Sequence, residues 1–556
     1  MSKREFTTEY LLYGLLFLLA ASVRFIHLGQ MALNNFEALQ AMQAFNISSG
    51  ANVLMGDQPA YVILTAGLFK LFSSGNFAAR FWPALIGSCA VFLPLLFRKA
   101  FGQRLALLLG LFLAIDPALV AISRTAGVES LAIVFGIGAA GFLVNKKMIL
   151  AGVCLGIAIA SGPAFWMGMV IFLLVYLSAS LFMHVYIFEG LEAKDFEVFG
   201  AGAIITMALL GTGFMAVPNG ITGISNGLLS FIHNWGSQSL VPLSSSLIVF
   251  GLTYFPLIIL AVMGLINSFN RRRELVSVMG IWFIAALFLM IVNPSREIWD
   301  WVWAALPLWG LTALGVDGLV YEISDDVRLA LIVEIVLSVV LVVFSYLNIL
   351  AYFNNPSSDL IVQNNRLIAA ALPIALVLLL TVFMAWGWSP RSAFRGLGIG
   401  VGILLFGWMA AGAMKNAGGM QQISGYAWKP QSITIGEQLV VSQINDLSIW
   451  NHGLPQNIDI DVVGFDVPAM RWALRDFSQV TYDTQFPQTA TPSIIIAPDY
   501  LQIGATTLYR GQGLAWEQYP AFAQMGLSDW LKWSFYREAP VEEIRLIVWA
   551  RNDLFK

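Results

Sequence analysis

Residues 104–144 read RLALLLGLFLAIDPALVAISRTAGVESLAIVFGIGAAGFLV. Two apolar runs, 104–121 and 128–144, flank a polar turn that contains Arg124 and Glu129. Lipid offers no hydrogen-bond partner for free backbone groups, so an apolar run of about 20 residues is expected to cross a bilayer as a helix. The stretch therefore predicts a helical hairpin in a membrane, with a charged turn at one surface.

The composition extends this prediction to most of the chain. Hydrophobic residues make up 58% of the 556 residues and charged residues only 11%, whereas a soluble domain carries roughly 25% charged residues. The net charge of −3 gives no basis for a nucleic-acid partner. These values predict a polytopic α-helical membrane protein whose main partner is the lipid bilayer.

The same criterion marks about thirteen transmembrane spans. They lie near 11–27, 77–97, 104–121, 128–144, 148–160, 164–182, 199–217, 246–267, 275–292, 301–320, 329–349, 367–386 and 396–414. Under this count the clustered cations fall on one side, which the positive-inside rule assigns to the cytoplasm. These clusters are Lys3-Arg4, Arg98-Lys99 with Arg104, Lys146-Lys147, Arg271-Arg272-Arg273, and Arg391 with Arg395. The N-terminus is thus expected inside and the C-terminus outside.

Two parts of the chain are expected outside the bilayer on the outer side. Within 30–76, the segments 36–47 and 59–72 are too short to span and are typical of interfacial helices. After a membrane domain at 1–414, residues 415–556 have the length of one soluble domain. Their alternating pattern predicts an α/β domain. Strands are expected at 458–463, 480–482, 493–497 and 544–550, and helices at 469–477 and 528–536.

Two acids follow outer ends of spans: Glu37 in the segment Asn34-Asn35-Phe36-Glu37-Ala38, and Glu129 in the turn quoted above. A carboxylate at the membrane surface can accept a proton from an incoming hydroxyl or hold a divalent ion against a phosphate. Each acid also stands where a helix begins, and there a carboxylate complements the helix dipole. Both interpretations stay open from the residues alone.

Three outer arginines, Arg80, Arg124 and Arg296, are candidates for binding a lipid phosphate, because guanidinium groups hold phosphate oxygens in pairs. Snorkelling to lipid headgroups is the alternative for Arg80 and Arg296. Asp57 is a further candidate for substrate binding, or a turn residue before Pro59. The four histidines show no zinc-ligand spacing, so no metal ligand is predicted. The cofactor stays open, a divalent cation being one option.

The order of these features resembles that of the GT-C superfamily of membrane glycosyltransferases, and within it the dolichyl-phosphate-mannose protein mannosyltransferase-like and flippase-activity-associated group. The likeness rests on an ordered set of motifs. They are Arg24 followed by Asn35-Phe36-Glu37-Ala38, then Gln58-Pro59-Ala60-Tyr61, Ser74-Gly75-Asn76-Phe77-Ala78-Ala79-Arg80-Phe81, Ser123-Arg124 with Glu129, Ser295-Arg296-Glu297 with Pro307, and Arg471-Trp472-Ala473-Leu474-Arg475-Asp476-Phe477. The chain departs from the pattern at Phe36, where that group has an aspartate.

The resemblance implies a glycosyltransferase that moves a sugar from a polyprenyl-phosphate-linked donor to an acceptor outside the cytoplasmic membrane of a prokaryote. It makes Glu37 and Glu129 the catalytic acids and places Arg124 or Arg296 at the phosphate. Two other functions stay open: a catalytically degenerate scaffold that serves as an accessory subunit beside other membrane-protein subunits, and a transporter or flippase component for the lipid-linked sugar.

Overall fold

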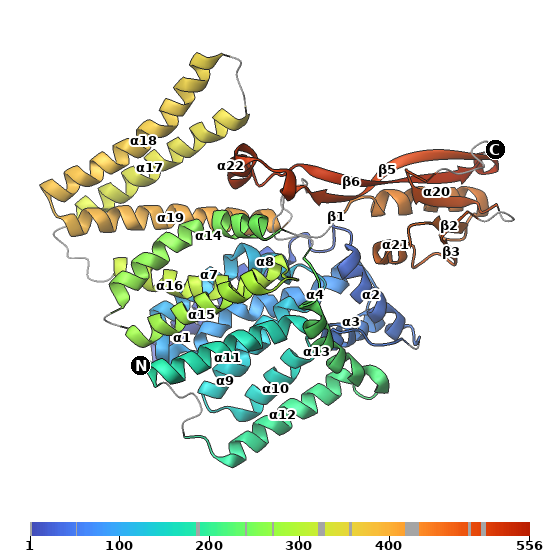
Figure 1. Ribbon diagram of the computed structural model, residues 1–556, viewed down its shortest axis with the longest axis horizontal. Coiled ribbons are helices and arrows are strands. Elements are labelled where there is room, and N and C mark those ends of the chain that lie inside the picture. The colour runs from blue at the N-terminus through green and yellow to red at the C-terminus, as the bar shows by residue number, and fades with distance from the viewer. Residues whose placement is uncertain are drawn as a thin grey trace.

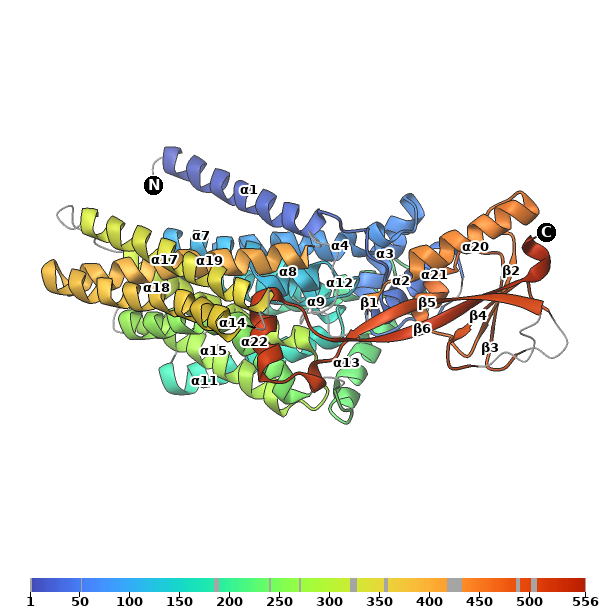
Figure 2. The same cartoon turned by 90° about the horizontal axis from the view of Figure 1, so that it is seen from above.

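A helical body and a sheet domain lie end to end in the molecule (Figures 1 and 2). The computed structural model describes residues 3–51, 53–184, 190–239, 242–269, 272–320, 328–354, 359–417, 433–486, 491–501 and 508–555. The N-terminus lies at the far end of the helical body from the sheet, as Figure 2 shows.

In these residues nine helical segments are long and apolar enough to cross a membrane. Three are complete helices: α11 (Pro163–Met183), α15 (Arg273–Val292) and α18 (Leu360–Gly387). Four are most of one helix: Thr8–Phe25 of α1 (Lys3–Phe25), Leu243–Ile266 of α14 (Leu243–Ser268), Leu329–Asn354 of α17 (Arg328–Asn354) and Pro390–Lys415 of α19 (Pro390–Asn416). The other two combine elements: Asn76–Leu96 comprises α4 (Asn76–Ser88), η1 (Cys89–Phe92) and α5 (Leu93–Leu96), and Trp299–Leu319 lies mostly in α16 (Val302–Val320). A tenth is α7 (Gln103–Ile115) with α8 (Pro117–Ser123), which meet at a 58° bend. The predicted fold class, a polytopic helical membrane protein, is confirmed.

The expected number of about thirteen spans is higher than length and composition support. The other three apolar runs also form helices, namely α9 (Glu129–Val144), α10 (Met148–Ile159) and α12 (Ala193–Gly211). The first two are 16 and 12 residues long, and the third begins with charged residues. Most of α9 is buried among other helices, so its hydropathy reflects packing against protein as well as contact with lipid.

A proline and a buried acid cause the bend between α7 and α8. Pro117 has no N–H to continue the first helix, and Asp116 caps the second by accepting a hydrogen bond from the Leu119 N–H at 2.6 Å. The other carboxylate oxygen accepts from Tyr254 Oη and from Trp309 Nε1, both at 2.8 Å. Asp116 therefore joins the bend to α14 and α16.

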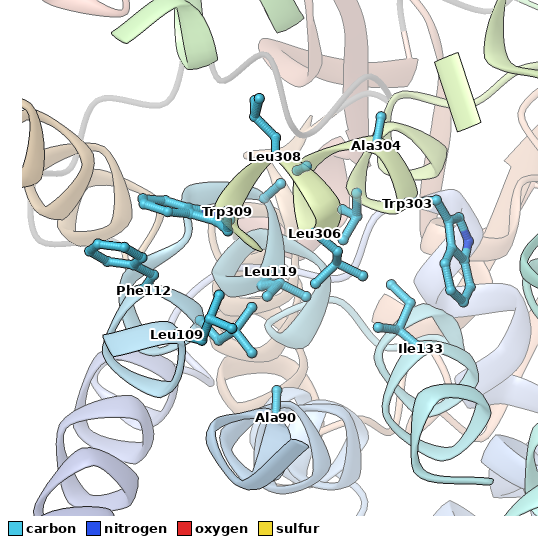
Figure 3. Packing of buried hydrophobic residues seen from close by; sticks show 14 of the residues in the cluster. Ala90, Leu109, Phe112, Leu119, Ile133, Trp303, Ala304, Leu306, Leu308 and Trp309 are labelled. Atoms are coloured by element: carbon cyan, nitrogen blue, oxygen red, sulfur yellow. The ribbon is translucent and has the colours of Figure 1, made fainter. Parts of the chain in front are cut away.

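The main apolar core surrounds this bend (Figure 3). Phe112 and Trp309 have ring centroids 4.6 Å apart, and side chains of α8, α9 and α16 fill the space beside them. Charged contacts mark the end of the body that holds the N-terminus: Arg98 pairs with Glu9 at 2.7 Å, and Arg272 donates to the Phe101 carbonyl.

The sheet domain has six strands in the order β1-β5-β6-β4-β2-β3. They are β1 (Ile433–Thr434), β2 (Asp459–Val463), β3 (Gln479–Asp483), β4 (Ile494–Pro498), β5 (Tyr509–Pro520) and β6 (Val541–Arg551). β2 pairs in parallel with β3 and β4, whereas β6 is antiparallel to β4 and β5. The predicted strands at 458–463, 480–482, 493–497 and 544–550 are confirmed; β1, β5 and helix α20 (Glu437–His452) were not predicted.

The two expected interfacial helices are present as α2 (Asn35–Ser48) and α3 (Pro59–Leu71). They share one apolar core with the sheet domain, which includes Ala41, Tyr61, Met470 and Ile460. The sheet domain therefore packs on α2 and α3 (Figure 1).

Helix α22 (Leu527–Tyr536) lies in the connection between β5 and β6 and returns to the membrane helices. Tyr536 Oη donates to the Leu350 carbonyl of α17 at 2.6 Å, and Lys415 Nζ of α19 donates to the Tyr536 carbonyl at 2.8 Å. The sheet domain is therefore attached to the helical body at two separate places.

Candidate functional site

Glu37 is buried and fully engaged at the first turn of α2. The Asn34 side chain and Glu37 form a capping box, in which the Glu37 N–H donates to Asn34 Oδ1 at 2.9 Å. The Glu37 carboxylate accepts two hydrogen bonds from Arg80, Nε to Oε1 and Nη2 to Oε2, each at 2.7 Å. The Ala126 N–H also donates to Oε1 at 2.9 Å. Glu37 thus connects the first outer segment to the turn that precedes Glu129.

Arg80 is equally engaged. Besides Glu37, its guanidinium donates to the carbonyls of Met31 at 2.7 Å and Ala32 at 2.9 Å, and its side chain is 3% exposed. A buried pair of this kind, with its remaining donors satisfied, is typical of a structural element that fixes loops. The geometry therefore gives Arg80 a structural contact in the place where the sequence suggested a phosphate.

Arg124 caps the outer end of α1. Its Nη1 donates to the carbonyls of Arg24 at 2.7 Å and Ile26 at 2.8 Å. Arg24 in turn donates to the Leu113 and Ala114 carbonyls at the end of α7. Arg124 thus stabilises the C-terminal end of α1, and Arg24 stabilises that of α7, because the helix dipole favours cations at these ends.

Glu129 begins α9 and has a free carboxylate oxygen. It is 5% exposed, and its Oε2 has no hydrogen-bond partner among the described residues. A Cβ on Gly127 would come within 2.5 Å of this oxygen, so the turn needs glycine to leave room for the carboxylate. Asp300, Glu37 and Asp57 all lie close enough to repel a negative charge on Glu129.

Two further acids belong to the site, and sequence reasoning did not assign them. Glu297 and Asp300 lie at η3 (Ile298–Trp301), where the Glu297 N–H donates to Asp300 Oδ2 at 3.0 Å. Burial, followed by the charges of Asp300 and Glu129, raises the pKa of Glu297 to about 8. Two carboxylates within four residues after Arg296 are the sequence signal that could have identified this part of the site.

Phe36 closes one side of this group of acids. Its ring centroid is 5.4 Å from that of Trp299, and a Cβ on Gly127 would lie 3.2 Å from its edge. The residue that departs from the family pattern therefore lies beside Glu129 and η3, where an aromatic pair borders the acids.

Arg296 directly precedes Glu297 in the sequence and keeps one side-chain donor without a partner among the described residues. Its Nη1 donates to the Asn293 carbonyl at 3.0 Å, while its Nε is buried without a partner among the residues described. Asp57 lines a hollow between α2 and α13 (Thr222–Asn234). Over the described ranges, no three His, Cys, Asp or Glu side chains are grouped so that they could hold a metal ion.

The fold and this site define a class: a multi-pass helical membrane protein with a sheet domain seated over buried acids at one end of the helices. Two solved structures share the fold. One is ArnT from Cupriavidus metallidurans in the apo state, with TM-score 0.55, 15% identity and coverage of 96% of this chain and 97% of that chain. The other is the same protein bound to undecaprenyl phosphate, with TM-score 0.54, 15% identity, and coverage of 97% of this chain and 98% of that chain.

The family model described as dolichyl-phosphate-mannose-protein mannosyltransferase matches residues 44–218. No curated protein matches the chain. The resemblance to GT-C membrane glycosyltransferases, inferred from the order of motifs, is therefore confirmed by the family match over residues 44–218 and by the ArnT-like fold of the whole chain.

Proposed function

We propose that the chain transfers a sugar from a polyprenyl-phosphate-linked donor to an acceptor hydroxyl on the outer face of a prokaryotic cytoplasmic membrane. The observation that carries this proposal is the free, buried carboxylate oxygen of Glu129, in a fold shared with an enzyme that has been seen with undecaprenyl phosphate. The N-terminus would face the cytoplasm and the sheet domain the outside.

In this reaction Glu129 accepts the proton of the acceptor hydroxyl as its oxygen attacks the anomeric carbon. The bond between that carbon and the phosphate oxygen breaks, and the lipid phosphate leaves with the electron pair. Arg296, with its free Nε, is the residue we assign to the departing phosphate. Glu37 and Arg80 position the loops, because their polar atoms are already bound to protein groups, and Arg124 holds the end of α1 through its Nη1.

The test is a transfer assay with the purified full-length protein and a radiolabelled polyprenyl-phosphate sugar, using a membrane lipid extract as the source of acceptor. Glu129→Gln should lower the rate by roughly 100-fold or more, and Arg296→Ala should lower it as well. Asp446→Asn, a change of an exposed acid on α20, is the control and should retain the rate. Equal rates in wild type and Glu129→Gln would remove the catalytic assignment.

One observation favours a second function, that of an accessory subunit without catalysis. Glu37 is neutralised by Arg80, and Phe36 packs on Trp299 beside the acids, so the acidic motif of the family is reduced to Glu129. On this alternative the wild-type protein gives no transfer, and affinity purification from its native membrane recovers a stable stoichiometric partner.

A further inference from the structure

A polar hollow of about 410 Å³ lies between α2 and α13, outside the group of acids around Glu129. Its lining residues are Leu39, Gln40, Gln43, Gly56, Asp57, Asn226, Leu229, Ser230, His233 and Asn234. Those on α2 and those on α13 recur every three or four residues, which places each set on one face of its helix. The hollow is thus bounded by two facing helical stripes, with residues 56–57 as its floor.

The floor of the hollow is held in place by the same two helices. The Gly56 N–H donates to Gln43 Oε1 at 3.1 Å, and Asn226 Nδ2 donates to the Met55 carbonyl at 3.1 Å. Behind the floor, the Asp57 carbonyl packs so closely on Gly162 that an added Cβ would lie only 2.1 Å away. The site is therefore formed before any ligand binds, which lowers the entropic cost of binding.

The chemistry of the lining selects the ligand. Amide, hydroxyl, imidazole and one carboxylate group line the hollow, and no lysine or arginine does among the described residues. The Asp57 carboxylate in the lining would repel an anion such as a phosphate. Gln40 is 3% exposed, and its Oε1 has no partner among the described residues. A buried acceptor of this kind costs stability until a donor reaches it.

The hollow lies next to the proposed reaction centre. Phe36, which borders Glu129, is one helical turn from Gln40 on the same face of α2. Asp57 lines the hollow and also lies within electrostatic range of Glu129. A ligand bound along this face of α2 would therefore present one end to Glu129.

We propose that this hollow is the acceptor site, and that the acceptor is a neutral carbohydrate whose hydroxyl groups bind Gln40, Asp57 and the polar face of α13. The inference rests on the proposed transferase function and names its second substrate class. Amide side chains offer a donor and an acceptor side by side, which matches neighbouring sugar hydroxyls. Leu39 and Leu229 supply apolar wall for the C–H faces of the ring.

The test is saturation-transfer difference NMR on the full-length protein in lipid nanodiscs. The probes are mannobiose, cellobiose and chitobiose at millimolar concentration, with a serine- and threonine-containing hexapeptide as the competing class. At least one disaccharide should receive saturation, and Gln40→Leu and Ser230→Ala should each lower its signal by roughly fivefold. Leu228→Ala, an exposed change on the opposite face of α13, should leave the signal unchanged.

Saturation of the peptide alone, or equal disaccharide signals in wild type, Gln40→Leu and Ser230→Ala, would overturn the proposal. Two variants are used so that the test still holds if one of them fails to fold. A thermal melt of each variant shows whether it is folded. Binding without any transfer by the wild type would refute the proposed reaction but keep the carbohydrate site, so the two failures are distinguishable.

Discussion

Among single residues, the ion pair between Glu37 and Arg80 has the clearest energetic consequence. Both side chains are 4% exposed or less, so removing one partner leaves a buried charge unpaired, at a cost of about 3–5 kcal/mol. We expect Arg80→Ala and Glu37→Gln each to lower the thermal unfolding temperature of the purified protein markedly. The exposed pair of Arg471 with Asp466, each 48% exposed, is the matched control.

Breaking that exposed pair with Arg471→Ala should cost less than about 1 kcal/mol, because solvent screens it. Similar losses at the two pairs would contradict a structural role for the buried one. This comparison separates positioning from catalysis, since Glu37→Gln is predicted to act on stability first and on transfer only as a consequence.

Glu297 gives the site a pH dependence that can be measured in the folding equilibrium. Its pKa is about 8 in the folded protein, above the ordinary value of 4.5. The folded state therefore binds this proton more tightly, and the stabilisation is lost as the pH rises from about 4.5 through 8. Glu297→Gln keeps the neutral form at every pH. Its unfolding temperature should equal that of wild type at pH 5 and exceed it at pH 9 by roughly 1–3 °C.

The control for this pH series is Glu538→Gln, a change of an exposed acid in the sheet domain. Its difference from wild type should be the same at both pH values. A Glu297→Gln variant whose difference from wild type does not change with pH would show that the Glu297 carboxylate is solvated in the folded protein.

Among the elements, α22 is the one that leaves its own domain. Phe535 packs against three aromatic side chains of the membrane helices, with ring centroids 5.8 Å from Tyr346, 6.0 Å from Phe353 and 5.9 Å from Trp408. We expect Phe535→Ala to release the helix at a cost of about 1–3 kcal/mol, less than for a fully buried ring. Hydrogen exchange should become faster in 521–540 and stay unchanged in β2 and β4.

Leu531→Ala, a change at an exposed position of the same helix (46% exposed), is the control and should leave exchange in 521–540 as in wild type. Unchanged exchange after Phe535→Ala would show that the two hydrogen bonds at Tyr536, and not the aromatic contacts, hold α22.

Apolar length and periodicity predicted the elements well, because both are local properties of the chain. Every predicted membrane run forms a helix. β5 escaped prediction because Gly511 and Gly513 interrupt its pattern, and its stability comes from β6, where Trp549 lies against Gly511. Glu334 lies in α17 and accepts a hydrogen bond from Thr381 of α18 at 2.6 Å. No local pattern could name that partner 47 residues away.

Only part of the candidate site could be predicted from the sequence, because its contacts join residues that are far apart in the chain. Glu37 and Glu129 stand out as acids at span ends, and a resemblance to known proteins points to them. What decides their state is long-range: Arg80 lies 43 residues from Glu37, and the backbone carbonyls that bind Arg124 lie 98 to 101 residues away. Sequence patterns give candidate residues, whereas three-dimensional contacts decide which of them keep free atoms for chemistry.

In the whole molecule, the sheet domain is hydrogen-bonded to the start of α2 and to the segment before α4. Asn35, next to Phe36, donates to Glu517 Oε1 at 2.7 Å and accepts from the Ala469 N–H at 3.1 Å. Arg475 donates to the Ser74 carbonyl at 2.9 Å. Through Arg475, the motif 471–477 therefore fixes the segment that precedes α4, the helix that carries Arg80.

Trp472 is the central residue of this contact between the domains, and its energetic coupling to the membrane domain can be measured. Its Nε1 donates to Asn76 Oδ1 at 2.8 Å, and its ring lies under the Arg475 guanidinium at 3.9 Å and beside Phe69 at 5.9 Å. Trp472→Phe removes the hydrogen bond and keeps most of the ring. Combined with Asn76→Ala in a double-mutant cycle, it should show a coupling of about 0.5–1.5 kcal/mol in unfolding free energy.

If the two losses add to within about 0.3–0.5 kcal/mol, the hydrogen bond between Trp472 and Asn76 does not set the position of the sheet domain. Coupling would instead mean that the sheet domain sets the position of α4 and therefore of Arg80. Arg80 binds Glu37, and Glu37 binds the Ala126 N–H, so the position of the turn before Glu129 would follow. On that chain of contacts, Trp472→Phe should slow sugar transfer although Trp472 touches neither Glu129 nor Arg296. Trp549→Phe, at the far side of the sheet against Gly511, should leave the rate unchanged.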